Sequence, residues 1–187
     1  MNKIKRRFLD VFARYFILIL VAMPNLYLFY LMFTPLTFYP VYFLLNLFFG
    51  ASLIGGVILS GQIPIELINA CIAGSAYYLL LILNLSIPNI KIRKRIKMVL
   101  FAFAFLLVIN ILRIFLLSTL LINGSVFFDL THKIFWYLFS MLFVVGIWLF
   151  EIKIFKIKEI PVYSDLKFLW KNSLLKDFKK SKRAEKD

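Results

Sequence analysis

Long apolar runs separated by short clusters of basic residues are the feature that most constrains this chain. Of its 187 residues, 63% are hydrophobic and only 17% are charged, whereas charged residues make up about a quarter of a typical soluble domain. An apolar run of about 20 residues is long enough to cross the core of a bilayer as a helix. The pattern therefore predicts an all-α fold, a polytopic membrane helix bundle.

The basic residues predict the topology of that bundle. The net charge is +14, and all basic residues except Arg113 and Lys133 lie in three blocks outside the apolar runs, near the N-terminus, at positions 91–97 and after position 152. Because loops rich in lysine and arginine stay on the cytoplasmic side, we expect a multi-pass plasma-membrane protein with cytoplasmic N- and C-termini. Basic blocks of this kind attract anionic headgroups, so we expect membrane lipids, and not nucleic acid, as partners.

About four full crossings follow from the lengths of the apolar runs. They are expected at about Tyr15–Phe33, Leu67–Ile87, Met98–Leu120 and His132–Phe150. Pro24 is expected to kink the first crossing. A further crossing at residues 38–60 would place the basic block at 91–97 outside. We expect instead a helix at about Tyr39–Ile54 that re-enters the membrane or lies on its outer face, followed by an extended piece at Val57–Ile65.

The chain divides into a membrane domain, residues 1–152, and a basic tail, residues 153–187. The tail holds eleven basic residues, and apolar residues recur at helical spacing after Ser164, which is a suitable N-cap. This pattern predicts an amphipathic helix lying on the cytoplasmic leaflet. A docking helix for a cytoplasmic partner is the alternative.

Helix counting brings three reactive side chains to a similar depth at the outer face. Counting about 20 residues back from the basic loop and from Glu151 reaches Cys71, the only cysteine, and His132, the only histidine. Counting forward from Lys97 places Arg113 about one turn below the outer boundary, from where its guanidinium can extend upward. A thiol, an imidazole and a guanidinium brought together in this way predict a nucleophilic site.

Three further polar residues lie near this group. Asn110 precedes Arg113 by three positions and shares its helix face. Glu66 and Asp129 are the acids on that side, and Asp129, three residues before His132, is the better placed to orient the imidazole ring. One cysteine, one histidine and two acids fall short of a typical four-ligand metal set, so we expect no metal and no other cofactor.

These residues resemble the motifs of the exosortase and archaeosortase family, which are membrane-embedded cysteine transpeptidases. The family pattern is Ala-Cys with a glycine shortly after, then Asn-x-x-Arg, then a histidine, each near the outer end of successive helices. Here the corresponding residues are Ala70-Cys71-Ile72-Ala73-Gly74, Asn110-Ile111-Leu112-Arg113 and His132. The resemblance covers about residues 37–150. Family members commonly have Ser or Thr after the cysteine and Gly next, whereas Ile72 and Ala73 precede the glycine here.

The resemblance implies a cysteine protease or transpeptidase that acts at the outer face of the membrane. Its substrate would be a secreted protein with a C-terminal sorting signal, made of a short motif, a transmembrane helix and a basic end. Cys71 would form a thioester, His132 would carry the proton and Arg113 would stabilise the oxyanion. The protein would then pass to an amine on a lipid or glycan carrier. The residues alone also fit a non-catalytic membrane scaffold, a small transport subunit or a thiol-dependent lipid acyltransferase.

Overall fold

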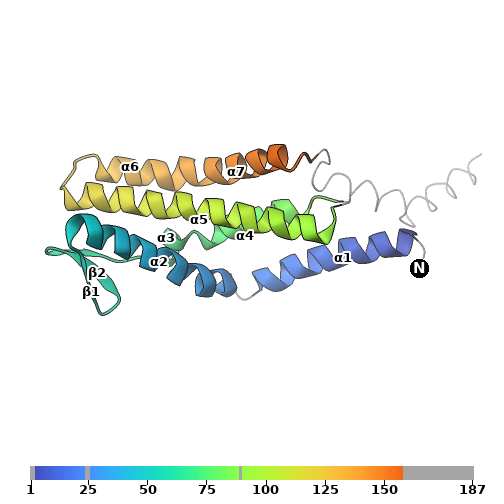
Figure 1. Ribbon diagram of the computed structural model, residues 1–187, viewed down its shortest axis with the longest axis horizontal. Helices are drawn as coiled ribbons and strands as arrows, with labels where there is room; N and C mark the ends of the chain where they lie inside the picture. Colours follow the sequence, from blue (N-terminus) through green and yellow to red (C-terminus); the bar gives the residue numbers. More distant parts are fainter. Residues whose placement is uncertain (1–2, 24–25, 89, 158–187) are drawn as a thin grey trace, which may run out of the picture.

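The helices of the protein run roughly along one axis, and a small sheet lies at one end (Figure 1). The computed structural model describes residues 3–23, 26–88 and 90–157. The helical elements are α1 (Lys3–Ala22), α2 (Tyr27–Phe49), α3 (Asn69–Ile72), α4 (Gly74–Leu85), α5 (Ile92–Ile122), α6 (Phe128–Ile134), the π-helical turn η1 (Phe135–Phe139) and α7 (Ser140–Ile154). The strands are β1 (Ser52–Ile54), β2 (Val57–Ser60) and β3 (Ile63–Ile65).

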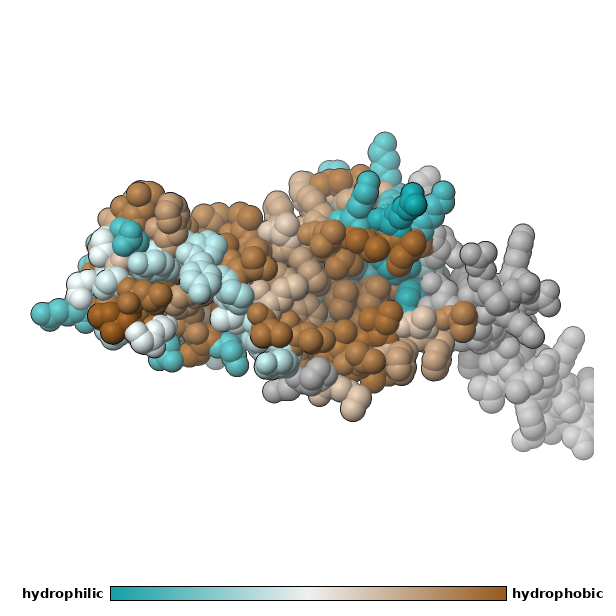
Figure 2. Space-filling view, turned by 60° about the horizontal axis from the view of Figure 1, so that its bottom comes forward, coloured by the Kyte–Doolittle hydropathy of each residue, from teal (hydrophilic) through white to brown (hydrophobic). Residues whose placement is uncertain are grey.

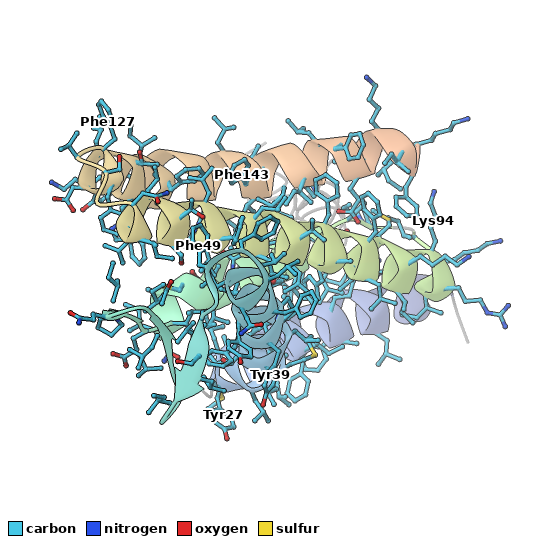
Figure 3. All side chains as sticks on the ribbon, turned by 60° about the vertical axis from the view of Figure 1, so that its left-hand side comes forward. Tyr27, Tyr39, Phe49, Lys94, Phe127 and Phe143 are labelled. Carbon is cyan, nitrogen blue, oxygen red and sulfur yellow. The ribbon has the colours of Figure 1, made fainter. Side chains whose placement is uncertain are left out.

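The bundle has two distinct ends. We name one the sheet end, which holds β1–β3 and the start of α6, and the other the basic end, which holds the starts of α1 and α5 and the end of α7 (Figure 1). The face drawn in Figure 2 is brown along the middle of the bundle and teal toward both ends, as expected for an apolar belt between two polar ends. Figure 3 shows Phe127 at the sheet end and Lys94 at the basic end.

Among the described residues, two helices, or three if a bent pair counts as one span, are long and apolar enough to cross a bilayer. They are α2, α5 and the pair formed by α6 and α7, whose two halves are bent by 50°. At 1.5 Å per residue, the 31 residues of α5 extend about 46 Å. This length exceeds the roughly 30 Å of the hydrocarbon core. The predicted multi-pass helical architecture is therefore supported at this level.

The helix predicted at residues 39–54, re-entrant or on the outer face, is not a separate element. α2 continues through both of its prolines, which membrane helices tolerate when neighbouring groups satisfy the freed backbone. It ends only at Gly50, which has a φ of 61° and donates its N–H to the carbonyl of Asn46. Pro24, the predicted kink, is not among the described residues, but α2 begins after Leu26, whose φ is also 61°.

A three-stranded sheet shows that the prediction of an all-α fold is wrong at the sheet end. β1 pairs with β2 and β2 pairs with β3, both antiparallel. The first two-residue turn, Gly55 and Gly56, has φ values of 58° and 84°, and Gly61 begins the second with a φ of 62°. These values suit the type I′ and II′ turns that match the twist of a hairpin. Ile58 and Ile65 are buried against the ends of α2 and α5.

The predicted second crossing, residues 67–87, is interrupted near its start. Ala73 separates α3 from α4 and adopts the left-handed conformation, with a φ of 61° and a ψ of 37°. The 12 residues of α4 extend about 18 Å, which is too short to cross a bilayer alone. Cys71 therefore lies on a separate short helical turn and not in the first turn of a long helix.

Two buried arginines close the basic end of α4. Arg95 of α5 donates from Nη1 to the carbonyl oxygens of Asn84 and Leu85, at 3.1 and 2.8 Å. Its Nη2 donates to the carbonyl of Ile87 at 2.9 Å, and Arg14 of α1 donates to Leu85 at 2.9 Å. The last carbonyls of a helix have no partner within it, and both arginines are only 5% exposed. Residues that the sequence analysis uses only as topology signals thus cap a helix.

A buried carboxylate joins α7 to the same end of α4. Asn84 donates from Nδ2 to Oε2 of Glu151 at 3.0 Å, and also to the carbonyl of Leu80 at 3.1 Å. Glu151 is 0% exposed, although the sequence analysis takes it only as the end of a crossing. The basic end is therefore held together by polar contacts among α1, α4, α5 and α7.

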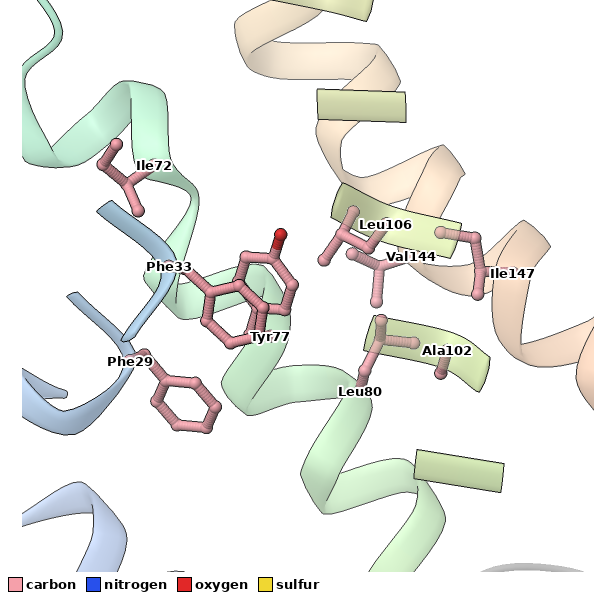
Figure 4. Packing of buried hydrophobic residues seen from close by; sticks show 9 residues of the cluster. All are labelled: Phe29, Phe33, Ile72, Tyr77, Leu80, Ala102, Leu106, Val144 and Ile147. Atoms are coloured by element: carbon pink, nitrogen blue, oxygen red, sulfur yellow. The ribbon is translucent and has the colours of Figure 1, made fainter. Parts of the chain in front are cut away.

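Aromatic rings join α2, α4 and α5 in the middle of the bundle (Figure 4). The rings of Phe33 and Tyr77 stack with centroids 3.6 Å apart. Phe103 packs edge-on against both, at 5.6 and 5.5 Å. Val144 and Ile147 bring α7 into the same cluster. Such aromatic pairs contribute about 0.5–1.5 kcal/mol each beyond area burial, so the cluster fixes the positions of α2 and α4 relative to each other.

The predicted fourth crossing starts earlier than His132 and is bent. α6 begins at Phe128, and the π-helical turn links it to α7. π-helical turns inside α-helices are a recognised cause of sharp kinks. α7 continues to Ile154, so no helix break marks the predicted domain boundary at residue 152. The predicted tail helix after Ser164 lies outside the described residues.

Replacing Arg95 by leucine is expected to lower the free energy of unfolding by about 2–4 kcal/mol, because buried carbonyls lose a charged donor. Thermal unfolding of the full-length protein in detergent measures this change. Arg93→Leu is the matched control, since Arg93 is exposed on the same helix, and it is expected to change stability by less than about 0.5 kcal/mol. Equal losses for the two variants would contradict the capping role.

Candidate active site

A cavity at the sheet end is lined by the predicted reactive side chains. Its volume is about 300 Å³, and its walls come from α3, α5, α6 and the segment that joins β3 to α3. The polar side chains on these walls are those of Glu66, Cys71, Arg113, Ser118 and His132. Most of the other lining residues are apolar. The thiol, the imidazole and the guanidinium predicted to converge therefore face one volume.

The interruption at Ala73 sets the position of Cys71. A non-glycine residue in the left-handed region costs about 1–2 kcal/mol, so the surrounding structure has to hold it there. The N–H of Cys71 donates to the carbonyl of Ile68 at 2.8 Å, which closes the short turn of α3. Cys71 itself is half-buried. Its thiol lies on a wall of the cavity, on a turn that is separate from the long axis of α4.

Gly74 follows the interruption and lets α4 approach α2 closely. A Cβ at this position would lie 2.7 Å from Cε1 and 2.8 Å from Cζ of Tyr30. These distances are shorter than real Cβ contacts allow. The glycine after the cysteine is thus required for helix packing beside the site, which gives a structural reason for that element of the motif.

Asn110 satisfies the backbone carbonyl of Cys71. Its Nδ2 donates to that oxygen at 2.8 Å, and Asn110 is only 3% exposed. Because the helix is interrupted two residues later, this carbonyl lacks the regular helical donor. The sequence analysis expects Asn110 to share a helix face with Arg113. The structure shows that its amide binds the backbone of the residue that carries the thiol.

Arg113 lies about one turn of α5 beyond Asn110, toward the sheet end. It is half-buried and lines the cavity. Leu117 and Leu121 continue the same helix face along the cavity wall. The guanidinium therefore belongs to the same cavity as the thiol, on a helix that also binds the backbone carbonyl of Cys71.

His132 approaches the cavity from α6 between two aromatic rings. Its ring stacks on Phe128, with centroids 5.7 Å apart and an interplanar angle of 13°. Trp136 lies edge-on to it at 6.4 Å. His132 is exposed, yet it lines the same cavity as Cys71. Stacking holds the orientation of the ring while leaving its nitrogens accessible.

The two acids expected near the site lie in different places. Glu66 lines the cavity with His132 and Arg113, whereas Asp129 is exposed and is not a lining residue. Among the described residues, no hydrogen bond or ion pair joins Asp129 to His132, whose ring packs on Phe128 instead. Spacing of three residues places two side chains on one helix face, but here it does not bring the carboxylate to the imidazole. Glu66 is the acid in position to act on this site.

Sequence reasoning missed two parts of the cavity. Ser118 is 4% exposed and lines the wall. It follows Arg113 by five residues, which is not a same-face spacing on a helix, so sequence spacing did not mark it. The second part is the segment of residues 64–68, which forms one wall. No sequence signal marks that wall, because it depends on the sheet that folds the chain back toward α5.

The combination of side chains in this cavity suits acyl transfer. A thiol provides the nucleophile, an imidazole can accept and return a proton, and a guanidinium can stabilise negative charge. Chemistry that starts from a thioester needs these three functions.

Comparison of the chain with known proteins identifies no relative. No family model matches it, and neither a curated protein nor a solved structure matches it. The argument for function therefore rests on the residues of this site.

Gly74→Ala is expected to lower the free energy of unfolding by about 1–3 kcal/mol, because the new methyl group overlaps the ring of Tyr30. Thermal unfolding in detergent measures the loss. Gly146→Ala is the control: Gly146 lies in α7 with nothing within 4 Å of a Cβ. Adding Tyr30→Leu to Gly74→Ala should restore part of the loss in a double-mutant cycle. A Gly74→Ala protein as stable as the Gly146→Ala protein would contradict this account.

Proposed function

We propose that this protein is a membrane-embedded cysteine transpeptidase of the exosortase and archaeosortase type. It cleaves a C-terminal sorting signal of secreted proteins and transfers the cleaved protein to a lipid or glycan acceptor. The observation that carries the proposal is the shared cavity of Cys71, Arg113 and His132. The motif resemblance supports the same reading.

The first half of the reaction forms a thioester on Cys71. The thiolate attacks the scissile carbonyl, which forms a carbon–sulfur bond and a tetrahedral oxyanion beside Arg113. The carbon–nitrogen bond then breaks, and His132 gives the departing amine the proton that it accepted from the thiol. Positive charge fixed next to the developing oxyanion lowers the barrier of this step.

The second half releases the protein onto its acceptor. An amine on a lipid or glycan carrier attacks the thioester carbonyl, His132 accepts the amine's proton, and the carbon–sulfur bond breaks to restore the thiol. Glu66 is the carboxylate placed to orient His132 or to pair with Arg113 during this cycle. The apolar belt around the bundle suits a substrate whose tail is a membrane helix.

The topology of the proposal follows from the basic end. With the basic end in the cytoplasm of a plasma-membrane protein, the cavity at the sheet end faces the outside. α1 and α2 together then form one outward pass, α3 and α4 an inward pass, α5 the next outward pass and α6–α7 the last inward pass. This arrangement keeps the four passes expected from the sequence while allowing two of them to be broken helices.

Cys71→Ala and Cys71→Ser are expected to abolish processing of a secreted protein that carries a C-terminal sorting signal, while the variants still insert and fold. Coexpression with such a protein, encoded beside this chain, and the mass of its processed form measure the effect. Full processing by both variants would eliminate the mechanism.

Labelling of Cys71 by a membrane-impermeant thiol reagent added from outside tests the orientation. Cys71 is the only cysteine, so any label identifies it. A scaffold predicts an inert thiol, and an acyltransferase predicts a thioester that forms with an acyl lipid and not with the sorting signal.

Arg113→Lys is expected to reduce the processing rate about 10- to 100-fold, because lysine keeps the charge but lacks the planar donor fork. Processing rates of the variant and the parent protein in the same coexpression assay measure this change. Arg93→Lys, on the exposed face of the same helix, controls for a general effect on α5. A normal rate for Arg113→Lys would show that the guanidinium geometry is not used.

A further inference from the structure

One edge of the small sheet leads directly into the cavity. The strand order is β1-β2-β3, so β3 is an edge strand, and its continuation through residues 66–68 forms a wall of the cavity that also holds Cys71. Ile68, at the end of this wall, is extended, with a φ of −81° and a ψ of 165°. An edge strand offers unpaired backbone groups to another chain. The edge and the nucleophile thus border one volume.

The hairpin register shows which backbone groups face that edge. A two-residue turn closes on a hydrogen-bonded pair, which here is Ser60 with Ile63. Because the pattern alternates along a strand, Ile63 and Ile65 direct their backbone groups toward β2. Pro64 therefore directs its backbone groups to the free edge. If the alternation continues past the end of β3, Glu66 does the same. Proline has no N–H to offer, and an edge position of this kind is where a strand tolerates it.

The segment before α3 has backbone groups with no backbone partner in the part of the chain that the structure describes. Among the described residues, no backbone hydrogen bond involves Glu66 or Leu67. Backbone N–H and C=O groups are nearly always paired in folded proteins, or are left for water or a ligand. The wall therefore presents a carbonyl at Pro64 and both backbone groups of Glu66 beside the cavity.

We propose that residues 64–67 bind an extended peptide as a fourth strand and so place its carbonyl carbon at Cys71. This inference rests on the proposed function and specifies how its substrate binds. The part of the substrate before the scissile bond is the secreted part, which lies at the sheet end. The substrate residues just before the scissile bond are therefore the ones that pair with the edge. Backbone pairing of this kind gives affinity largely independent of side chains.

Chloromethyl ketones of alanine peptides test the strand without knowledge of the sorting motif. The sulfur of Cys71 displaces chloride from the reagent, and mass spectrometry of the full-length protein in nanodiscs measures the rate. Acetyl-tetra-alanine chloromethyl ketone is expected to react about tenfold faster than acetyl-alanine chloromethyl ketone, the effect of one to two net hydrogen bonds. N-methylation of single backbone amides in the longer reagent should remove this advantage at alternate positions only, because alternate residues face the edge.

Two proline variants locate the pairing edge. Glu66→Pro removes the edge N–H and is expected to cancel the tenfold ratio between the two reagents. The residue before it, Ile65, belongs to β3 and so already has the extended backbone that proline requires of its predecessor. Leu53→Pro removes an N–H from the opposite edge, in β1, and should leave the ratio near tenfold.

The outcomes separate this inference from the proposed function. Equal rates for the two reagents, or equal sensitivity to N-methylation at every position, would overturn strand pairing while leaving Cys71 as a nucleophile. Loss of the ratio in Leu53→Pro but not in Glu66→Pro would overturn it as well. Failure of both reagents to alkylate Cys71 in the folded protein would count against the nucleophile itself, and both proposals would fall.

Discussion

Backbone carbonyls left without helical partners inside an apolar surround need donors from elsewhere, and this need governs both ends of the α3–α4 segment. An unsatisfied polar group in a bilayer core costs several kcal/mol. Near the sheet end, Asn110 donates a hydrogen bond to the carbonyl of Cys71. At the basic end, Arg95 and Arg14 donate to carbonyls at the end of α4 and just after it. Two of these three donors, Asn110 and Arg95, belong to α5, so the hydrogen bonds of this long helix stabilise the interrupted α3–α4 segment.

The same contacts fix the geometry of the site. Because α5 binds the interrupted segment at two levels, it can neither slide nor rotate relative to α3 without losing buried hydrogen bonds. Arg113 lies on the same helix face as Asn110, so the register that satisfies the carbonyl of Cys71 also sets where the guanidinium lies. Preorganised charge of this kind acts without reorganisation during a reaction. One face of α5 thus both satisfies the buried carbonyl of Cys71 and positions the guanidinium of Arg113 at the cavity.

Sequence reasoning predicted correctly those features that depend on how deep a residue lies along the bundle. It did not predict features that depend on tertiary contacts. Charged blocks and helix lengths brought Cys71, Arg113 and His132 to one end of the bundle, and the structure places all three on one cavity. The extended piece at residues 57–65 was predicted and contains β2 and β3. Its pairing into a sheet was missed, because strands this short have little intrinsic preference and depend on burial against α2 and α5. Glu66 was ranked below Asp129 because spacing in sequence is a local argument. Glu66 reaches the cavity only after two hairpins have turned the chain back.

In the proposed reaction, the sheet and the apolar belt suit two states of the one proposed substrate. A membrane helix satisfies its own backbone, so its scissile amide is inaccessible until the helix unwinds locally at the bilayer boundary. Unwinding frees N–H and C=O groups of the substrate at a depth where water is scarce. The strand edge beside Cys71 offers C=O and N–H groups that can form hydrogen bonds with them. The helical remainder of the tail can stay in lipid against the bundle. On this reasoning the sheet lies beside the nucleophile because a strand edge lowers the cost of opening the helix that is to be cut.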